Sequence, residues 1–353
     1  MNIPNINLSA VVTKPTPVAG ARRYLLQAQT TPGVFTLQID NSSLEVFTAC
    51  ARSAEYKLVH ARDGGSRSPL TYGGAIHNGL EVWYRAGLTN DEVTWTNMIL
   101  KAEERYAEAA PVNDWRTFDR CIDTLARYVS KYPTEAFEVY ERNGTPQVEL
   151  PFSLPLQVVE VNAPLPYTYA DIVDPSTYVP SVANLPVYVK EIHVYWTGKM
   201  DLMINLDNAL WVMDHKTTSI AGPSYFREYE LAQQTIGYCW AAQQIYGQPV
   251  TGLLLNAIIG RPLTKTGTGT DFQRQRYYYR PDQLEEWNLD ICTLTADFIA
   301  NLTRGFFPRE TKWCVGKYGV CPYFEVCTLP PTQRLSFLSS DYFTNVTWSP
   351  LAE

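Results

Sequence analysis

The sequence predicts a protein of the α/β or α+β class, built from helices, then a sheet, then a helix, a strand and a helix. Three observations predict it: apolar residues recur at helical spacing across residues 42–130, strand-like alternation replaces that spacing from residue 137, and both patterns then alternate to about residue 304. The chain has 353 residues, of which 45% are apolar and 18% are charged. This composition is typical of a folded protein with a real core and excludes a disordered chain or a coiled coil.

Net charge and the pattern of cysteines argue against further classes of protein. With 29 Lys and Arg against 36 Asp and Glu, the net charge is −7, which argues against a generally cationic nucleic-acid binder but not against an enzyme with a local basic groove. Seven scattered cysteines are not a disulfide framework. The N-terminus lacks a secretory pattern, and no apolar run approaches the ~18–20 residues that a membrane helix needs. We therefore expect a soluble protein of a reducing cytoplasm without a membrane partner.

The order of the elements follows from local signals. A capping box at Ser42 and Glu45 predicts a helix start, and apolar spacing predicts three more helices. Strands are expected from residue 137, then a hairpin, and five prolines predict a long loop between these strands. The expected ranges are helices 76–88, 91–109, 114–130, 224–246 and 281–304, hairpin strands 191–206 and 209–218, strand 251–259 and a polar loop 264–270.

We expect these elements to form one integrated domain without internal repeats. Four stretches of the chain differ in composition, and the third contains the proline-rich insertion 164–186. They are an extended arm (1–40), a helical region (41–136), a core (137–305) and a cysteine-rich segment with a tail (306–353).

The expected hairpin places two aspartates opposite each other. A two- or four-residue loop centred on Asp207 and Asn208 pairs residues whose numbers sum to 415, and Asp201 and Asp214 fit that sum. Directly opposed residues have Cβ atoms ~5 Å apart, and two carboxylates that close need a cation or a shared proton. Alternation puts Lys216 on the face of Asp214. The alternative is a cross-strand ion pair of Asp201 and Lys216, and a three- or five-residue loop would shift the register.

These residues resemble a known family. Gly198-Lys199-Met200-Asp201 followed by Asp214-His215-Lys216 resembles the GxxD…(D/E)xK core of the PD-(D/E)xK nuclease superfamily, and Gln234–Tyr238 is similar to the QxxxY motif of its RecB-like branch. The helix around His77 and the strand around Glu149 resemble the elements before that core. The resemblance implies a restriction-endonuclease-like fold, a mixed central sheet flanked by helices, preceded by a helical region and followed by a cysteine segment.

The resemblance also implies roles for these residues. Asp201, Asp214, the backbone carbonyl of His215 and His77 would bind Mg²⁺ or Mn²⁺, for which hard oxygen and imidazole ligands are suited. Lys216 would orient water or stabilise developing negative charge, and Glu149 would be the acidic residue of the first core strand. Gln234 and Tyr238 share a helix face and would contact DNA near the site; alternatively Tyr238 is a core residue and Gln233 is the functional amide.

Three cysteines lie within 14 residues of the C-terminal segment. In a reducing compartment Cys314, Cys321 and Cys327 favour metal ligation, with a fourth thiolate from elsewhere. Iron–sulfur members of the RecB-like group, among them AddB and the CRISPR-adaptation nucleases, add one early cysteine in a context similar to that of Cys50. The resemblance implies a 4Fe-4S cluster on these four residues, although the gap after Cys314 is longer than usual and Ala51 replaces a common proline. A structural Zn²⁺ and no metal are the alternatives.

A basic and aromatic surface is the last candidate. Arg274, Arg276 and Arg280 flank a run of tyrosines, 277–279, and such residues suit phosphate contact and base stacking. Arg52, beside Cys50, is a further candidate for DNA contact, and Lys317 lies within a second basic group. A solvated strand edge is the equally weighted alternative. No sequence-reading module is present, so we expect sequence-nonspecific binding to ends or single strands.

The whole pattern leads to one hypothesis with a rival. We expect a metal-dependent DNA exonuclease that hydrolyses phosphodiester bonds with metal-activated water and carries an iron–sulfur cluster, as in phage- or prophage-encoded RecB-like exonucleases; its place would then be the host cytoplasm. No phosphate loop is present, so no ATP-driven translocation is expected. A homo-oligomer and a recombination partner protein stay open. The rival is a non-catalytic DNA-end-binding or scaffold protein with a relic site.

Overall fold

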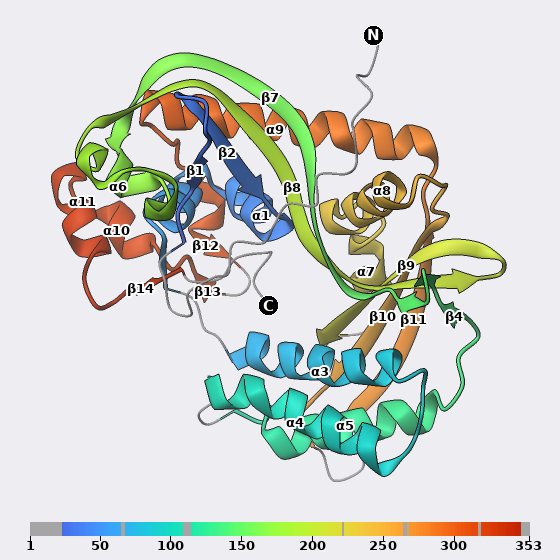
Figure 1. Ribbon diagram of the computed structural model, residues 1–353. Coiled ribbons are helices and arrows are strands. Elements are labelled where there is room, and N and C mark those ends of the chain that lie inside the picture. Colours follow the sequence, from blue (N-terminus) through green and yellow to red (C-terminus); the bar gives the residue numbers. More distant parts are fainter. Residues whose placement is uncertain are drawn as a thin grey trace. The chain divides into compact units, whose positions relative to one another are not determined.

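The computed structural model describes residues 23–64, 68–108, 114–220, 222–263, 267, 269–316 and 319–346 (Figure 1). The chain divides into two compact units. Unit 1 comprises Met1–Gly64, Pro151–Gly198 and Leu294–Glu353, and unit 2 comprises Gly65–Leu150 and Lys199–Thr293. No described helix is both long enough and apolar enough to cross a membrane.

Unit 2 is organised around a mixed sheet, which confirms the predicted fold class. Within it β8 (Pro186–Leu206) pairs antiparallel with β9 (Ala209–Thr218), β9 pairs parallel with β10 (Gly252–Gly260), and β10 pairs antiparallel with β11 (Thr270–Tyr278). A parallel pair needs a crossover connection. Here α7 (Pro223–Glu228) and α8 (Gln233–Tyr246) make that crossover.

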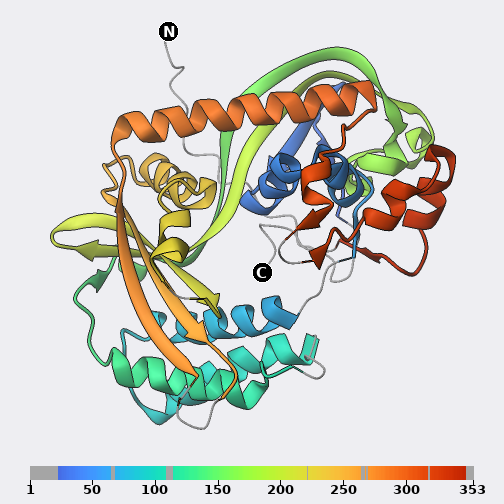
Figure 2. The same ribbon diagram turned by 180° about the vertical axis from the view of Figure 1, so that it is seen from behind.

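Helices cover both faces of this sheet. Helices α3 (Ser68–Arg85), α4 (Glu92–Glu108) and α5 (Phe118–Lys131) lie on one side and α8 on the other (Figures 1 and 2). Buried side chains of α3 to α5 form one hydrophobic core with the sheet, including Trp83, Leu125 and Met213. Burial of such side chains contributes about 1.5–3 kcal/mol each and anchors the helices to the sheet.

The β8–β9 turn fixes the register of the hairpin. Asp207 and Asn208 both have positive φ, at 53° and 59°, as a type I′ two-residue turn requires. The register runs from Leu206 opposite Ala209 to Leu202 opposite Met213. The predicted register, in which paired residue numbers sum to 415, is therefore confirmed.

Unit 1 combines the remaining elements. Strands β1 (Leu26–Ala28) and β2 (Val34–Ile39) pair with each other, and β2 runs parallel to the Glu191–Trp196 part of β8. A small apolar cluster around Tyr56, Tyr323 and Val326 supports the C-terminal segment. The helices of this unit are α1 (Asn41–Ala49), α2 (Ala51–Ala54), η1 (Glu55–Val59), α6 (Tyr169–Ile172), η2 (Pro175–Thr177), η3 (Pro180–Val182), η4 (Thr311–Trp313), α10 (Phe324–Thr328) and α11 (Pro331–Leu338).

Two long strands and one long helix contribute residues to both units. They are β7 (Val148–Thr168), β8 and α9 (Pro281–Arg304). The short strands are β3 (Arg62–Asp63), β4 (Glu138–Val139), β5 (Glu141–Arg142), β6 (Thr145–Pro146), β12 (Val315–Gly316), β13 (Gly319–Val320) and β14 (Thr344–Asn345).

Three local expectations need correction. Helix α1 is capped by Asp40, whose Oδ1 accepts a 2.7 Å bond from the Ser43 amide, so Ser42 is not the cap. Pro164 and Pro166 belong to β7 rather than to a loop, because β7 pairs only with β8 among the described strands and an edge strand tolerates proline. The helix expected over 224–246 is broken between α7 and α8. Of the expected arm, residues 1–22 lie outside the described residues, as do Lys317 and most of the loop 264–270.

Candidate functional site

Helix α3 brings His77 close to the sheet. A Cβ placed on Gly73, one turn before His77, would lie only 2.8 Å from Oγ1 of Thr217 on β9. A glycine is therefore needed where the helix crosses the strand that carries Asp214 and Lys216. The first glycine of the Gly-Gly pair in the sequence around His77 thus has a packing reason in addition to its place in a motif.

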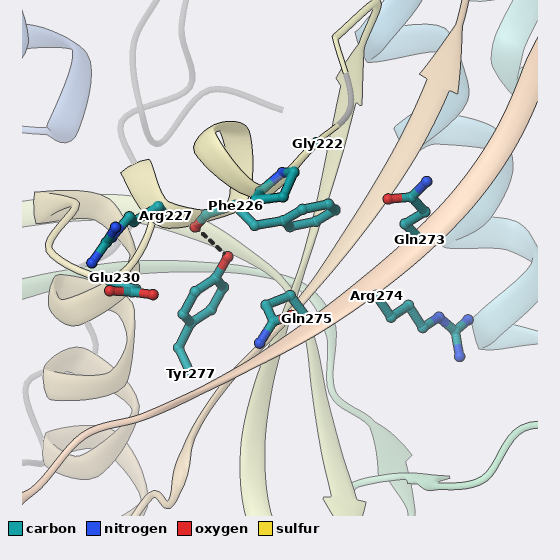
Figure 3. Close-up of a pocket in the computed structure, with 9 residues that line it drawn as sticks. Gly222, Phe226, Arg227, Glu230, Gln273, Arg274, Gln275 and Tyr277 are labelled. Atoms are coloured by element: carbon teal, nitrogen blue, oxygen red, sulfur yellow. Dashed lines mark hydrogen bonds between the residues drawn. The ribbon is translucent and has the colours of Figure 1, made fainter.

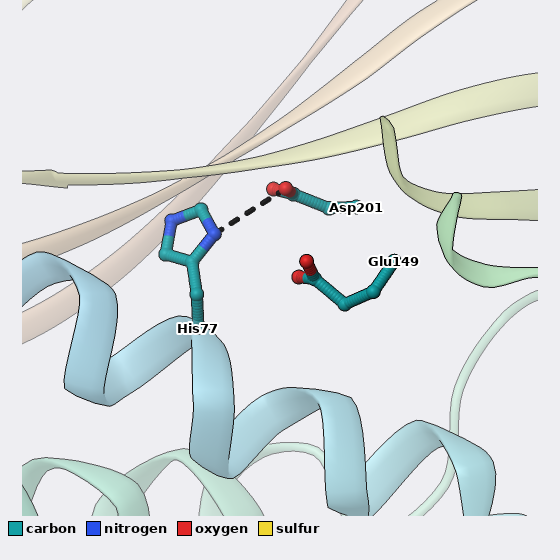
Figure 4. A group of neighbouring side chains, drawn as sticks. All are labelled: His77, Glu149 and Asp201. Atoms are coloured by element: carbon teal, nitrogen blue, oxygen red, sulfur yellow. Dashed lines mark ion pairs between the residues drawn. The ribbon is translucent and has the colours of Figure 1, made fainter. Parts of the chain in front are cut away.

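Three side chains converge in unit 2 as a candidate cation site. One ligand atom from each of His77, Glu149 and Asp201 lies within 4.8 Å of the others (Figure 4). Nδ1 of His77 is 3.3 Å from Oδ1 of Asp201. Two carboxylates and an imidazole at this spacing fit Mn²⁺ or Mg²⁺, which prefer oxygen ligands and accept some nitrogen.

Glu149 is held in place by its backbone and by two neighbours. Its φ of 50° lies in the left-handed region, which is rare for a residue other than glycine, and such backbone strain clusters at functional sites. From α3, Arg85 donates a 2.8 Å bond to the carbonyl oxygen of Val148. Lys199 forms an ion pair with the Glu149 carboxylate. Helix α3 therefore supplies His77 and also holds the chain beside Glu149.

Asp201 is oriented by both of its oxygens. Oδ1 faces His77, and Oδ2 accepts a 2.6 Å bond from the backbone N–H of His215. Asp214 lies on the opposite strand, β9, and is 2% exposed. Its Oδ2 lies 2.6 Å from Nζ of Lys216. The hairpin register therefore brings Asp201 beside the Asp214–Lys216 pair, although Asp214 is outside the three-residue group. Its role as a ligand, like that of the His215 carbonyl, stays a prediction.

The pKa values of these groups are shifted by burial and by each other. Burial raises the pKa of Asp214, and the nearby Asp201 raises it further. Burial also raises the pKa of Glu149. For Asp201 burial acts upward, but His77, His215 and Lys216 together lower its pKa. Carboxylates that repel one another in a buried site are the electrostatic condition in which a divalent cation is bound strongly.

The pKa values of the neighbouring basic groups depend on the same balance between burial and opposite charge. Burial acts to lower the pKa of His77 and of Lys216, but the carboxylates around them raise both values. His215 differs, because burial lowers its pKa to about 3. His215 is therefore an uncharged ring next to the charged groups.

Gln234 and Tyr238 share one face of α8, as their spacing predicts. The side-chain amide of Gln234 donates a 2.9 Å bond to the hydroxyl of Tyr238, and α8 packs on β9 and β10. Their predicted contact with DNA stays untested.

Arg274 has a different environment from the one expected for a DNA contact. Its guanidinium forms a buried ion pair with Glu135, with NH1 at 2.6 Å from Oε2. Arg276, by contrast, is exposed and pairs with Asp207 at the hairpin turn. In unit 1, Arg52 pairs with Glu55 and lies over the ring of Phe306. The predicted DNA contacts of these arginines stay untested, but the Arg274 guanidinium serves an internal network.

That network contains residues that the sequence analysis missed. Glu135, Tyr84, Tyr128 and Asn256 are joined by hydrogen bonds of 2.7 to 2.9 Å. Asn256 carries the one signal that could have been used, because it is a lone polar residue in the apolar run 252–259. A buried amide requires polar partners, so its position indicates a polar network at this point of the sheet.

A shallow pocket of about 600 Å³ lies between α7 and the edge strand β11. It is lined by the aromatic rings of Phe226 and Tyr277, by Arg227 and by the amides of two glutamines, Gln273 and Gln275 (Figure 3). Tyr277 donates a 2.6 Å bond to the Phe226 carbonyl and so ties the two walls together. Aromatic faces with amide and guanidinium donors can contact bases and phosphates.

The four cysteines predicted as cluster ligands all lie in unit 1, whereas the other three lie in unit 2. Cys50 separates α1 from α2, and its Sγ accepts a 3.4 Å bond from the Glu310 amide. The Cys321 amide bonds to the carbonyl of Cys314. Burial raises the pKa of the Cys314 and Cys327 thiols, and Cys321 and Cys50 raise both further. The thiols therefore influence one another electrostatically, although among the described residues no group of three or more cysteines brings its sulfur atoms within 4.8 Å of one another.

The surroundings of these thiols fit a metal group. Cys314 and Cys327 line a pocket of about 550 Å³ together with two arginines, Arg309 and Arg334. Both arginines also donate to the Cys327 carbonyl. Arg309 acts to lower the pKa of Cys314 and Arg334 acts to lower that of Cys327, against the rise caused by burial. Positive charge of this kind favours thiolates, and four thiolates are a donor set that suits an iron–sulfur cluster or a zinc ion.

Comparison with known proteins gives one match over most of the chain. The family model described as "PD-(D/E)XK nuclease superfamily" matches residues 41–328, a range that contains the candidate cation site, Lys216 and the four cysteines of unit 1. A search of curated proteins finds no match. Among solved structures 15 chains match, and one, titled "Crystal structure of SSO0001", shares 12% identity over 85% of this chain and 89% of that chain, with a TM-score of 0.29.

Proposed function

Because the chain belongs to the PD-(D/E)XK nuclease superfamily, we propose that it is a metal-dependent DNA exonuclease of the RecB-like branch. One observation carries the proposal: His77, Glu149 and Asp201 from three separate elements bring their ligand atoms within 4.8 Å of one another. The partly buried Lys216 lies beside Asp214, and carboxylates with a neighbouring ammonium are groups that can support phosphodiester hydrolysis.

The positions of these residues indicate which of them would bind the metal and which would act on the water and the phosphate. His77, Glu149 and Asp201 would hold Mg²⁺ or Mn²⁺, with Asp214 and the His215 carbonyl as further oxygens. When bound, the metal acts as a Lewis acid and lowers the pKa of water. Lys216, whose ammonium is held by Asp214, would orient the attacking water and stabilise negative charge on the phosphate.

The nucleic acid would lie along the pocket between α7 and β11. Arg227 supplies a charged donor, and Gln275 supplies an exposed amide. Tyr225 of α7 contributes to the raised pKa of Lys216, which supports a nucleic-acid path between this helix and the lysine. Gln234 and Tyr238, on the next helix, would extend the contact. These groups recognise phosphates and base faces without reading sequence.

We further propose a 4Fe-4S cluster held by Cys50, Cys314, Cys321 and Cys327, with structural Zn²⁺ as the alternative. The interacting thiols and the two arginines of their pocket support it. Bound there, the group would join the Cys50 segment to the C-terminal segment within unit 1.

Incubation of anaerobically purified protein with linear and circular DNA, single- and double-stranded, tests the nuclease proposal. Wild type with Mg²⁺ or Mn²⁺ should degrade linear DNA and spare circles, and Lys216→Ala should lose this activity. Lys131→Ala, at the exposed end of α5, is the matched control and should cleave normally. Cleavage of circles would change the proposal to an endonuclease. No cleavage by wild type would refute the enzyme and favour a DNA-end-binding protein with a relic site.

A further inference from the structure

The buried ion pair of Arg274 and Glu135 is connected to His215 through Asn256. The roles proposed so far do not explain why this pair is buried. Arg274 of β11 binds Glu135 through two parallel bonds, NH1 to Oε2 at 2.6 Å and NH2 to Oε1 at 2.8 Å. The side chains are 17% and 1% exposed. Burial of such a pair costs desolvation that its attraction barely offsets, so the pair by itself is weak evidence for a stabilising role.

Arg274 also determines how Asn256 is oriented. Its Nε donates a 3.1 Å bond to Oδ1 of Asn256, and its NH2 donates a 2.9 Å bond to the hydroxyl of Tyr128. A guanidinium has donors and no acceptor, so the amide oxygen of Asn256 must face it. The NH₂ group of Asn256 is consequently turned the other way, toward Tyr128 and His215.

The orientation of Asn256 in turn determines the tautomer of His215. The Asn256 amide nitrogen lies 2.8 Å from Nδ1 of His215. Because an amide NH₂ only donates, Nδ1 must accept, and the proton of the neutral ring is on Nε2. Tyr84 stacks on the same ring, with 5.6 Å between centroids and 15° between planes. The Tyr84 hydroxyl is itself held by Glu135 at 2.8 Å.

The backbone of His215 connects this ring to the site, because its N–H donates to Oδ2 of Asp201 at 2.6 Å. We propose that Glu135 and Arg274 are positioning residues of the metal site: acting through Asn256 and Tyr84, they fix the tautomer and orientation of His215 and thereby the peptide that orients Asp201. The inference rests on the metal site of the proposed function. It assigns a role to two charged residues that do not belong to the group of candidate metal ligands.

The first test is Mn²⁺ binding without DNA, measured by calorimetry on the whole protein. Arg274→Lys keeps the charge but cannot bond Glu135, Tyr128 and Asn256 together. We expect its Mn²⁺ dissociation constant to rise by about 10- to 100-fold, as is usual when an outer partner of a metal ligand is lost. Arg276→Lys, two residues along the same strand and exposed, should bind Mn²⁺ as wild type does. An unchanged constant in Arg274→Lys would overturn the proposal.

A second readout separates positioning from general stability. Nitrogen-15 spectra of the imidazole should show one tautomer with the proton on Nε2 in wild type and a mixture in Arg274→Lys. Leu284→Ala, in the buried face of α9, should lower the melting temperature without changing Mn²⁺ affinity or the tautomer. A matched loss of affinity in Leu284→Ala would show that the network acts only through stability.

A substitute variant and a comparison with DNA cleavage complete the test. Should Arg274→Lys fail to fold, Tyr128→Phe removes one hydroxyl of the same network with little change in volume, and a smaller rise in the Mn²⁺ constant is expected; no rise would contradict the proposal. Wild type that binds Mn²⁺ with the single tautomer but cleaves no DNA would refute the proposed function and leave the positioning role standing.

Discussion

Replacing Gly73 by alanine tests how closely α3 must approach the sheet. The added Cβ would meet Oγ1 of Thr217 at 2.8 Å, about 0.6 Å inside ordinary contact, so the helix must retreat or Thr217 must turn. Overpacking costs about 1–3 kcal/mol, and alanine returns about 1 kcal/mol of helix propensity relative to glycine. The net loss of stability should therefore be about 1 kcal/mol.

The same retreat would displace His77, one turn further along the helix. Because a misplacement of 1 Å costs about 100-fold in rate, a shift of this size should lower DNA cleavage by about 10-fold. Denaturant unfolding and initial cleavage rates with Mn²⁺ are the measurements. Gly74→Ala is the matched control, since its Cβ would meet only the side chain of Arg105, with Nε nearest at 3.1 Å.

A double variant separates the contact from other effects of the alanine. Thr217→Ala removes Oγ1, and the nearest remaining atom would be the Cβ at 3.9 Å. Gly73→Ala combined with Thr217→Ala should therefore recover most of the stability and rate lost by Gly73→Ala alone. Equal behaviour of Gly73→Ala and Gly74→Ala, or no recovery in the double variant, would refute this account of the glycine.

Three further outcomes are expected. Mn²⁺ at one hundred times its dissociation constant should stabilise unit 2 by about 2.7 kcal/mol in thermal unfolding, and a wild type indifferent to Mn²⁺ would contradict the metal site. Cys50→Ser should lose most of the bound iron measured by elemental analysis, whereas Cys121→Ser, buried in the core of unit 2, should keep it; zinc in place of iron would select the alternative. Arg227→Ala should weaken binding of single-stranded DNA by about 3- to 10-fold and reduce its salt dependence, and an unchanged affinity would remove the α7–β11 pocket from the binding path.

Local signals predicted the register of the β8–β9 hairpin well. The Asp207-Asn208 turn selects a type I′ geometry, and this fixes the pairing of every residue before and after it. The position of Asp201 opposite the Asp214 strand therefore follows from sequence spacing alone. Whether these residues act as ligands depends on metal binding, which spacing does not decide.

The features that the sequence did not predict depend on contacts between segments far apart in the chain. Arg274 is next to tyrosines in sequence and was predicted to face DNA, but its partner Glu135 is 139 residues away. Nothing local distinguishes such a buried arginine from an exposed one. The expectation of a loop at Pro164 and Pro166 was wrong, since proline is excluded from central strands but not from an edge strand such as β7.

The central claim is that one metal site, built on Asp201, hydrolyses DNA. Its most direct test is the cleavage rate of end-labelled linear DNA across a Mg²⁺ titration, for wild type and for Asp201→Asn. We predict metal-dependent cleavage by wild type that EDTA abolishes, and a loss of about 1,000-fold or more in Asp201→Asn, whose amide cannot replace the charge at the metal. Cleavage that persists in EDTA, or equal rates for the two proteins, would contradict the account.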